Sequence, residues 1–232
     1  MIKIRKKNEI FFIDGNWFKA YWHFSFDRYY DLDNMQFGKL RVFNVDTLIP
    51  GAVWPMHPHT EMEVVTYCTD GEFKHADNLG NNGVLLPGDV QHTTIGSGML
   101  HSEINNSKTK PMAFIQIWIL PKTKGLAPSV EQKHVKKEER LDKFLPVVSN
   151  QHKDALPIEQ DAEVFVSTLQ TGKKLAHNFE SGFGGYFYVI SGEVKLNKHS
   201  LSEGDAAKIS NEKSIDIEAI KESHLLMVVV KI

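Results

Sequence analysis

Short apolar runs alternate with turn residues along the whole chain. The runs are rich in Val, Ile, Phe and Tyr, with Gly, Pro, Asn and Asp between them, and they occupy residues 41–45, 63–68, 113–120, 186–190, 193–196 and 224–232. β-Branched and aromatic residues favour strands, and many short strands with frequent turns are typical of all-β sandwiches and barrels. Only the charged run 131–144 could hold a modest helix. The pattern therefore predicts an all-β protein.

The second half of the chain is a degenerate repeat of the first. VVTYCTDGEFK at 64–74 resembles YFYVISGEVK at 186–195, and a Gly-Asp turn follows each run, at 88–89 and at 204–205. A repeat at about one hundred residues indicates two β-barrels in tandem rather than a solenoid. We expect an N-terminal metal-binding barrel over 1–130, a charged connector over 131–146 and a C-terminal barrel without metal over 147–232.

Composition limits the class of protein and the cellular compartment that this chain fits. The chain of 232 residues is 41% hydrophobic and 24% charged with a formal net charge of -2, which is typical of a globular protein and unlike a basic nucleic-acid-binding domain. A single cysteine, Cys68, excludes an internal disulfide and fits a reducing compartment. No apolar segment reaches the length of about 20 residues that a membrane span needs. We expect a cytoplasmic protein that binds neither nucleic acid nor membrane.

Two short runs carry metal-binding side chains at alternate positions. His57 and His59 lie in the run HPH, and His101 and Glu103 lie in the run HSE. Successive side chains of a strand point to opposite faces, so each pair shares a face if its run is a strand. Three imidazoles and one carboxylate that converge in one barrel suit a divalent first-row transition metal.

The ordered motifs of the chain resemble those of the pirin family of bicupins. Gly51, His57-x-His59, Glu63 and Gly71 follow the spacing of the first cupin motif. The runs NLGNNGVLLPGDVQ, GSGMLHSE and FIQIWILPKTKGLAPSVEQK come after it in order. The resemblance covers nearly the whole chain and is strongest to bacterial pirin-like quercetin 2,3-dioxygenases. It implies two tandem cupin-type, jelly-roll-like barrels, with a degenerate second barrel. There His177 and Phe179 stand near the positions of the histidine pair, and nothing resembles HSE.

The resemblance also implies a ligand set and a metal. The ligands would be His57, His59, His101 and Glu103, and the metal would be Fe(II), with Mn, Co, Ni, Cu or Zn as alternatives. Glu63 has the strand parity of the histidine pair and competes with Glu103 for the carboxylate position. Either carboxylate is a candidate catalytic proton acceptor near the metal.

A further group of residues is expected to wall the substrate pocket. His92 follows the Pro-Gly turn at the spacing of a general cupin's third histidine, a position where pirins usually carry an apolar or aromatic residue. We expect His92 to line the pocket, and a surface histidine at a turn is the alternative. The other expected pocket residues are apolar: Met62, Phe114, Phe24 and Phe26.

The implied reaction is the oxidative ring cleavage of flavonols such as quercetin by dioxygen, with release of carbon monoxide. The partners would then be a small aromatic substrate and dioxygen. The alternative is a non-catalytic, iron-dependent regulatory protein of the pirin type that binds another protein. A third possibility is isomerase or other cupin chemistry on a sugar-like substrate. A pocket dense in Arg and Lys would favour it, and these motifs do not indicate such a pocket.

Overall fold

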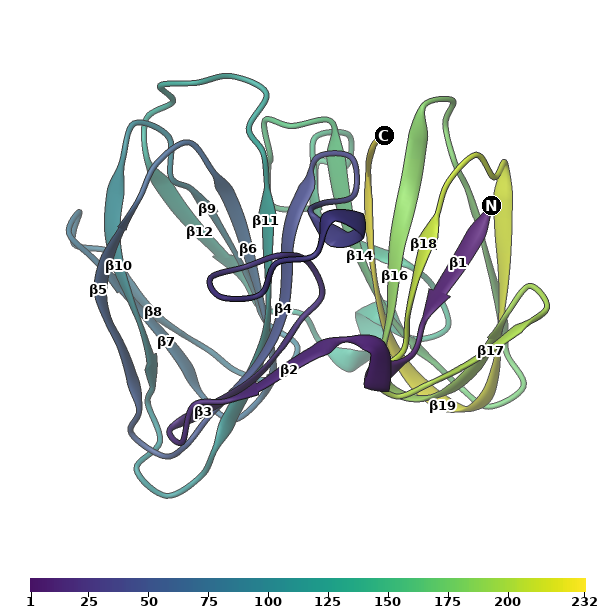
Figure 1. Ribbon diagram of the computed structural model, residues 1–232, viewed down its shortest axis with the longest axis horizontal. Helices are drawn as coiled ribbons and strands as arrows, with labels where there is room; N and C mark the ends of the chain where they lie inside the picture. Colours follow the sequence, from purple (N-terminus) through teal and green to yellow (C-terminus); the bar gives the residue numbers. More distant parts are fainter.

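The chain folds into two β-barrels that lie side by side, one from each half of the sequence (Figure 1). The computed structural model describes residues 1–232. Besides strands it contains only the short 3-10 helices η1 (Lys7–Glu9), η2 (Leu32–Asn34) and η3 (Lys137–Arg140). The all-β architecture with two tandem barrels confirms the prediction from the strand pattern. No helix is long and apolar enough to cross a lipid bilayer.

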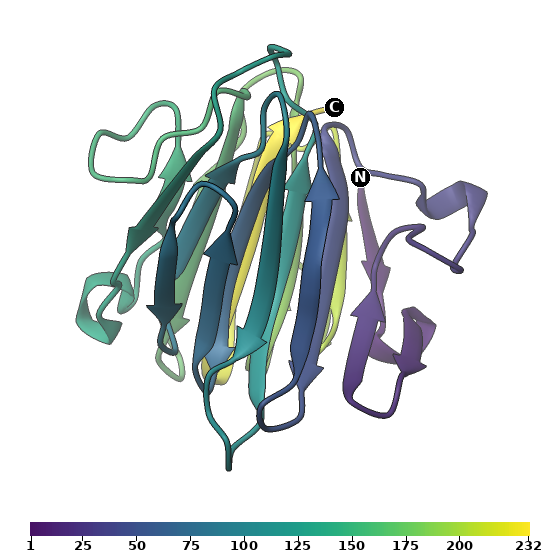
Figure 2. The same ribbon diagram turned by 90° about the vertical axis from the view of Figure 1, so that its left-hand side faces the viewer.

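Two antiparallel sheets form the N-terminal barrel, which lies in front of the C-terminal barrel in Figure 2. A seven-stranded sheet has the order β12-β9-β6-β11-β4-β3-β2, and a four-stranded sheet has the order β5-β10-β7-β8. Their strands are β2 (Phe11–Asp14), β3 (Phe18–Trp22), β4 (Leu40–Leu48), β5 (Val53–His59), β6 (Glu63–Asp70), β7 (Phe73–Asp77), β8 (Asn82–Leu85), β9 (Val90–Thr94), β10 (Met99–Asn105), β11 (Met112–Ile119) and β12 (Ser129–Lys133).

One eight-stranded sheet forms the C-terminal barrel. Its main path is β1-β18-β16-β19-β14-β13, while β15 pairs with β19 and β17 pairs with β16. The strands are β1 (Ile2–Arg5), β13 (Leu145–Ser149), β14 (Ala162–Leu169), β15 (Lys174–Asn178), β16 (Phe183–Leu196), β17 (His199–Ser202), β18 (Ala206–Ile209) and β19 (Ser214–Lys231). Because β16 and β19 are long, each contributes to two parts of the barrel.

Strand pairing differs from the predicted domain boundaries at two places. The first strand, β1, pairs with β18 of the C-terminal barrel, whereas the sequence pattern predicts that residues 1–130 belong to the N-terminal barrel. In the other direction, β12 pairs with β9 as far as Lys133, which lies inside the expected connector 131–146. The helical part of that connector is limited to η3. The N-terminal segment therefore ties the two barrels together.

The largest apolar core lies between the barrels. On β11, Ile115 and Ile117 belong to this core, whereas Phe114 belongs to the interior of the N-terminal barrel. On β14, Val164 faces the shared core and Phe165 faces the interior of the C-terminal barrel. This alternation explains why these strands are apolar on both faces.

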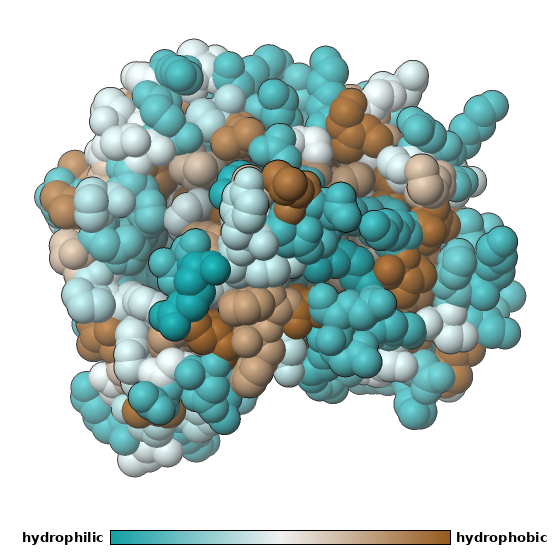
Figure 3. Space-filling view, in the orientation of Figure 1, coloured by the Kyte–Doolittle hydropathy of each residue, from teal (hydrophilic) through white to brown (hydrophobic).

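The interior of the N-terminal barrel is not uniformly apolar. Phe73, Met112 and Phe114 form part of an apolar cluster, but His101 and Glu103 are also buried. The face of the molecule shown in Figure 3 is mainly hydrophilic, with smaller groups of apolar residues among the polar ones. Buried ionisable groups inside a barrel mark the place where chemistry is expected.

Candidate metal centre

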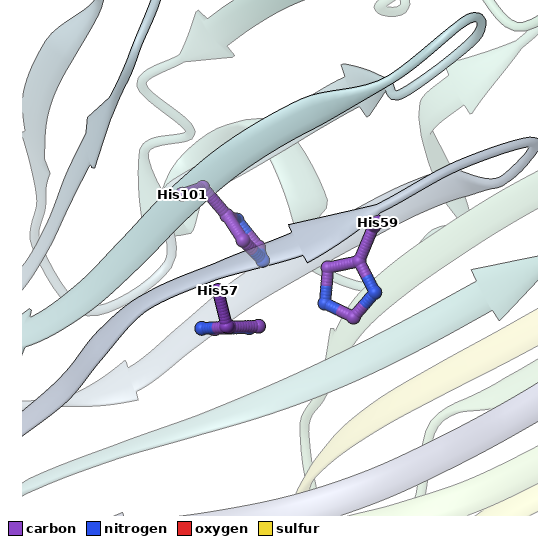
Figure 4. A group of neighbouring side chains, drawn as sticks. All are labelled: His57, His59 and His101. Carbon is purple, nitrogen blue, oxygen red and sulfur yellow. The ribbon is translucent and has the colours of Figure 1, made fainter.

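Three histidines converge inside the N-terminal barrel (Figure 4). The antiparallel strands β5 and β10 are neighbours, and their register places His57 opposite His101. Residues directly opposite each other share a face, and His59 joins them because it is two positions along β5. One nitrogen from each ring lies within 4.8 Å of the others. Strand pairing alone therefore brings these imidazoles to one point.

The hydrogen bonds of the three rings leave nitrogen lone pairs free. His57 Nδ1 lies 2.7 Å from the carbonyl oxygen of Pro55, so Nδ1 donates the hydrogen and Nε2 keeps its lone pair. The Nε2 atoms of His59 and His101 are buried and have no hydrogen-bond partner. Burial, followed by the neighbouring His57, lowers the pKa of His59 to about 4 and that of His101 to about 3. Neutral imidazoles with unused lone pairs are the form that binds a metal ion.

Glu103 lies beside the histidine cluster and lines the same cavity. The register of β10 against β5 shifts between His101 and Glu103, so Glu103 pairs with Trp54. The carboxylate Oε1 accepts a hydrogen bond from Gln116 Nε2, and Oε2 accepts none. Burial raises the pKa of Glu103 to about 7, and the bond from Gln116 lowers it in part. A nearby cation would favour the charged form of this carboxylate.

Glu63 is directed away from this site, which corrects the expectation that it competes with Glu103. The turn between β5 and β6 contains Glu61 with a φ of 51°, so the alternation of β5 does not continue into β6. Glu63 is fully buried, and its carboxylate accepts the backbone N–H groups of Glu159 and Gln160, each at 3.0 Å. It therefore fastens the N-terminal barrel to the segment that precedes β14.

His92 also lies outside the metal cavity, contrary to the expectation that it lines the substrate pocket. It is buried on β9, where its Nε2 is 3.3 Å from Glu63 Oε2. Its neighbour across the sheet is Val65, a residue of the core between the barrels. His92 lines a separate cavity, of about 340 Å³, together with Thr94 and Glu131. Glu63 and His92 both lie on the outer face of the seven-stranded sheet, so neither side chain reaches the metal cavity.

A cavity of about 440 Å³ opens beside the histidines. Of the expected apolar walls only Phe26 lines it. Phe24 is buried in the core between the barrels, Phe114 is in the apolar cluster of the N-terminal barrel, and Met62 packs against a small separate cluster. The residues that line the cavity are Trp22, Phe26, Asn44, Asp46, Trp54, Pro55, Met56, His57, His59, Glu103, Gln116 and Trp118.

Known proteins share this combination of barrels over the whole chain. The Pirin family matches residues 3–119, and the quercetinase C-terminal cupin domain matches residues 146–229. A pirin-like protein of Caulobacter vibrioides is 42% identical over 217 residues, which is 93% of each chain. The chain belongs to the pirin family. The quercetin 2,3-dioxygenase of Escherichia coli K12 is 32% identical to this pirin over 227 residues, or 98% of this chain and 97% of the relative.

A solved structure bears on the metal. The crystal structure of the bacterial pirin YhhW from Escherichia coli in complex with nickel(II) superposes with a TM-score of 0.94 at 31% identity, covering 100% of this chain and 99% of that one. In this pirin the unpartnered Nε2 atoms of His59 and His101 fit the same kind of occupant. The histidine cluster and the nickel-bound relative together indicate that the site holds a metal ion.

Sequence reasoning misses most of the cavity walls of this pirin, although a signal for two of them exists. Asn44 and Asp46 are polar residues at alternate positions of the largely buried strand β4, and both line the cavity. Gln116 and Trp118 share the inward face of β11. Asp46 is buried, and this burial, together with the neighbouring Glu103, raises its pKa well above the usual value. Polar residues at alternate positions of a buried strand thus point to the cavity.

Proposed function

We propose that this pirin is a metal-dependent dioxygenase that cleaves the central ring of flavonols such as quercetin and releases carbon monoxide. The observation that carries the proposal is a cluster of three histidines beside a cavity of about 440 Å³ with aromatic walls. Cavities of ~300–1,000 Å³ with apolar walls and a few polar groups are typical small-molecule sites. The name of the Escherichia coli relative, quercetin 2,3-dioxygenase, supports the choice of substrate class.

We assign the metal to His57, His59, His101 and Glu103, and Fe(II) is our proposed ion. The three imidazoles and one carboxylate match the preferences of divalent first-row metals. When bound, the ion supplies Lewis acidity that favours the deprotonated form of a substrate hydroxyl. The protein contributes the remaining functions through its own side chains.

Aromatic side chains would position a flat substrate and limit access of water. The rings of Trp22 and Phe26 are 5.3 Å apart, those of Phe26 and Trp118 are 5.4 Å apart, and those of Trp118 and His59 are 4.7 Å apart, measured between centroids. This row leads from the cavity wall to the histidine cluster. An apolar wall of this kind favours an aromatic substrate over a sugar-like one, and no Lys or Arg lines the cavity.

Glu103 is the proposed acceptor of the substrate's hydroxyl proton. Trp118 Nε1 donates to Gln116 Oε1 at 3.0 Å, and Gln116 Nε2 donates to Glu103 Oε1. This chain of hydrogen bonds fixes the orientation of the carboxylate toward the cavity. Asp46 is the second carboxyl group that faces the same space, and it replaces Glu63 as the additional candidate.

The test is turnover of quercetin by protein loaded separately with iron, manganese, cobalt, nickel or copper. We expect dioxygen uptake, quercetin loss and carbon monoxide release in equal amounts with at least one metal. The matched controls are metal-free protein and His57→Ala, in which turnover should vanish. If the protein binds each metal but turns over quercetin with none of them, the proposal that it is an enzyme would be refuted. The alternative, an iron-dependent regulatory protein, would then be favoured.

A further inference from the structure

The C-terminal barrel contains a cavity at the position that corresponds to the metal site of the N-terminal barrel. β15 pairs with β19 as β5 pairs with β10, and His177 lies opposite Ile215 where His57 lies opposite His101. The second barrel therefore has one histidine and an apolar partner, and the only metal-type cluster of the chain is the N-terminal one. A cavity of about 350 Å³ nevertheless remains beside His177.

Several aromatic rings line this second cavity. The centroids of Phe144 and Phe165 are 6.0 Å apart, those of Phe165 and His177 are 5.2 Å apart, and those of Phe144 and His177 are 6.1 Å apart. The three rings meet edge to face, with interplanar angles of 67°, 63° and 82°. Phe183 adds a fourth ring to the lining. Phe144, Phe165, His177 and Phe183 therefore line one small cavity together.

The charged groups of the lining are acidic. Glu163 and Glu180 line the cavity, and no Lys or Arg does. Glu163 Oε2 accepts a hydrogen bond from Ser149 Oγ at 2.9 Å and lies 3.3 Å from His152 Nε2, while its Oε1 accepts none. Glu180 has no ion-pair partner. Burial lowers the pKa of His177. The cavity therefore has two carboxylates with accepting capacity to spare.

We propose that this cavity binds a small organic ammonium ion, independently of the metal centre. Aromatic faces attract cations through their quadrupoles, and quaternary ammonium ligands are recognised by aromatic cages. The carboxylate of Glu163 supplies the countercharge. An aromatic or aliphatic neutral guest would use the rings but not the carboxylates.

Choline and its neutral isostere, 3,3-dimethyl-1-butanol, form the matched pair of probes. All four tryptophans precede residue 119, outside this cavity, so fluorescence would not report on it. We would load the full chain with Zn(II), which is diamagnetic because it is d¹⁰, and measure saturation transfer to the probe methyl groups together with titration calorimetry. Choline should bind roughly tenfold more tightly than the isostere. No choline binding, or equal binding of the two probes, would overturn the proposal.

Substitutions locate the site. Glu163→Gln and Phe144→Leu should each weaken choline binding roughly tenfold. The control Glu222→Gln, on an exposed part of β19 where it pairs with Lys137, should leave choline binding unchanged. Binding that survives both cavity variants but is lost in Trp118→Leu would place choline in the N-terminal cavity and refute the assignment. Because no turnover is measured, a failed flavonol assay would leave the result intact.

Discussion

The buried imidazoles of His59 and His101 each leave Nε2 without a hydrogen-bond partner. A buried polar group with no partner costs about 1–3 kcal/mol in proteins. The arrangement of His59 and His101 would therefore be unfavourable unless something else uses the lone pairs of these two atoms. A metal ion does so, and its binding would offset the cost of the arrangement. Burial of the histidines therefore favours metal binding, because the ion uses the lone pairs that burial leaves without a partner.

Replacement of His57 by Ala should abolish stoichiometric metal binding and leave the fold intact. Removal of a hydrogen-bond partner of a metal ligand costs ~10–100-fold in affinity, and removal of the ligand itself should cost more. The apolar cores do not include His57, so the melting temperature of metal-free protein should barely change. Elemental analysis and thermal unfolding would measure both effects. Complete unfolding would instead identify a structural metal.

Glu103→Gln should weaken metal affinity and reduce quercetin turnover. Proton transfer by a positioned carboxylate typically contributes ~10²–10⁴-fold to a rate, which sets the expected loss. Gln116 should still contact the new amide, so the local packing is preserved. Steady-state kinetics at saturating metal would separate the loss of turnover from the loss of metal. Unchanged values of both would contradict the assignment of Glu103.

At the scale of the strands, alternation predicts the histidine cluster but does not decide between the two candidate carboxylates, Glu103 and Glu63. His57, His59 and His101 lie on two directly paired strands, so their common face follows from the period of two. Glu63 looks equivalent in the sequence because it keeps the same parity. The tight turn through Glu61, with its positive φ, resets the facing of β6, and no pattern of apolar residues reveals that change.

The position of Glu63 yields a prediction about stability instead of chemistry. Glu63→Gln should leave metal content unchanged and destabilise the protein by about 1–3 kcal/mol, because it weakens charge-assisted bonds to the backbone N–H groups of Glu159 and Gln160. Urea denaturation and elemental analysis would check the two parts. Loss of metal with unchanged stability would restore Glu63 as a candidate ligand.

For the whole molecule, the sequence predicts the two barrels better than the joint between them, meaning the contacts that connect one barrel to the other. The tandem barrels follow from strand pattern and repeat, whereas the crossing of β1 to β18 depends on a long-range pairing that local sequence does not encode. The joint also contains a buried polar cluster: Arg140 Nη1 donates to Tyr67 Oη at 2.6 Å and to His224 Nε2. These residues come from β6, η3 and β19, so the cluster holds the two barrels and the connector together.

This cluster predicts a loss of stability in acid. Burial, followed by the charge of Arg140, lowers the pKa of His224 to about 3 from the model-peptide value of 6.5. Below pH 6.5 His224 binds a proton in the unfolded chain but stays unprotonated in the folded chain. The free energy of unfolding should therefore fall as the pH drops toward 3. One group with this shift removes up to roughly 4 kcal/mol between pH 6.5 and 3.5.

His224→Gln isolates the contribution of this histidine to the acid response. The amide can still accept from Arg140 but does not titrate, so the free energy of unfolding should depend less steeply on pH by about one proton between pH 6 and 4. Urea titrations of metal-free wild type and variant across that range would measure the difference. The comparison cancels the histidines of the metal centre, which are identical in both proteins. Parallel curves would show that His224 binds its proton as readily in the folded chain as in the unfolded one, and the buried joint would then not be the source of acid sensitivity.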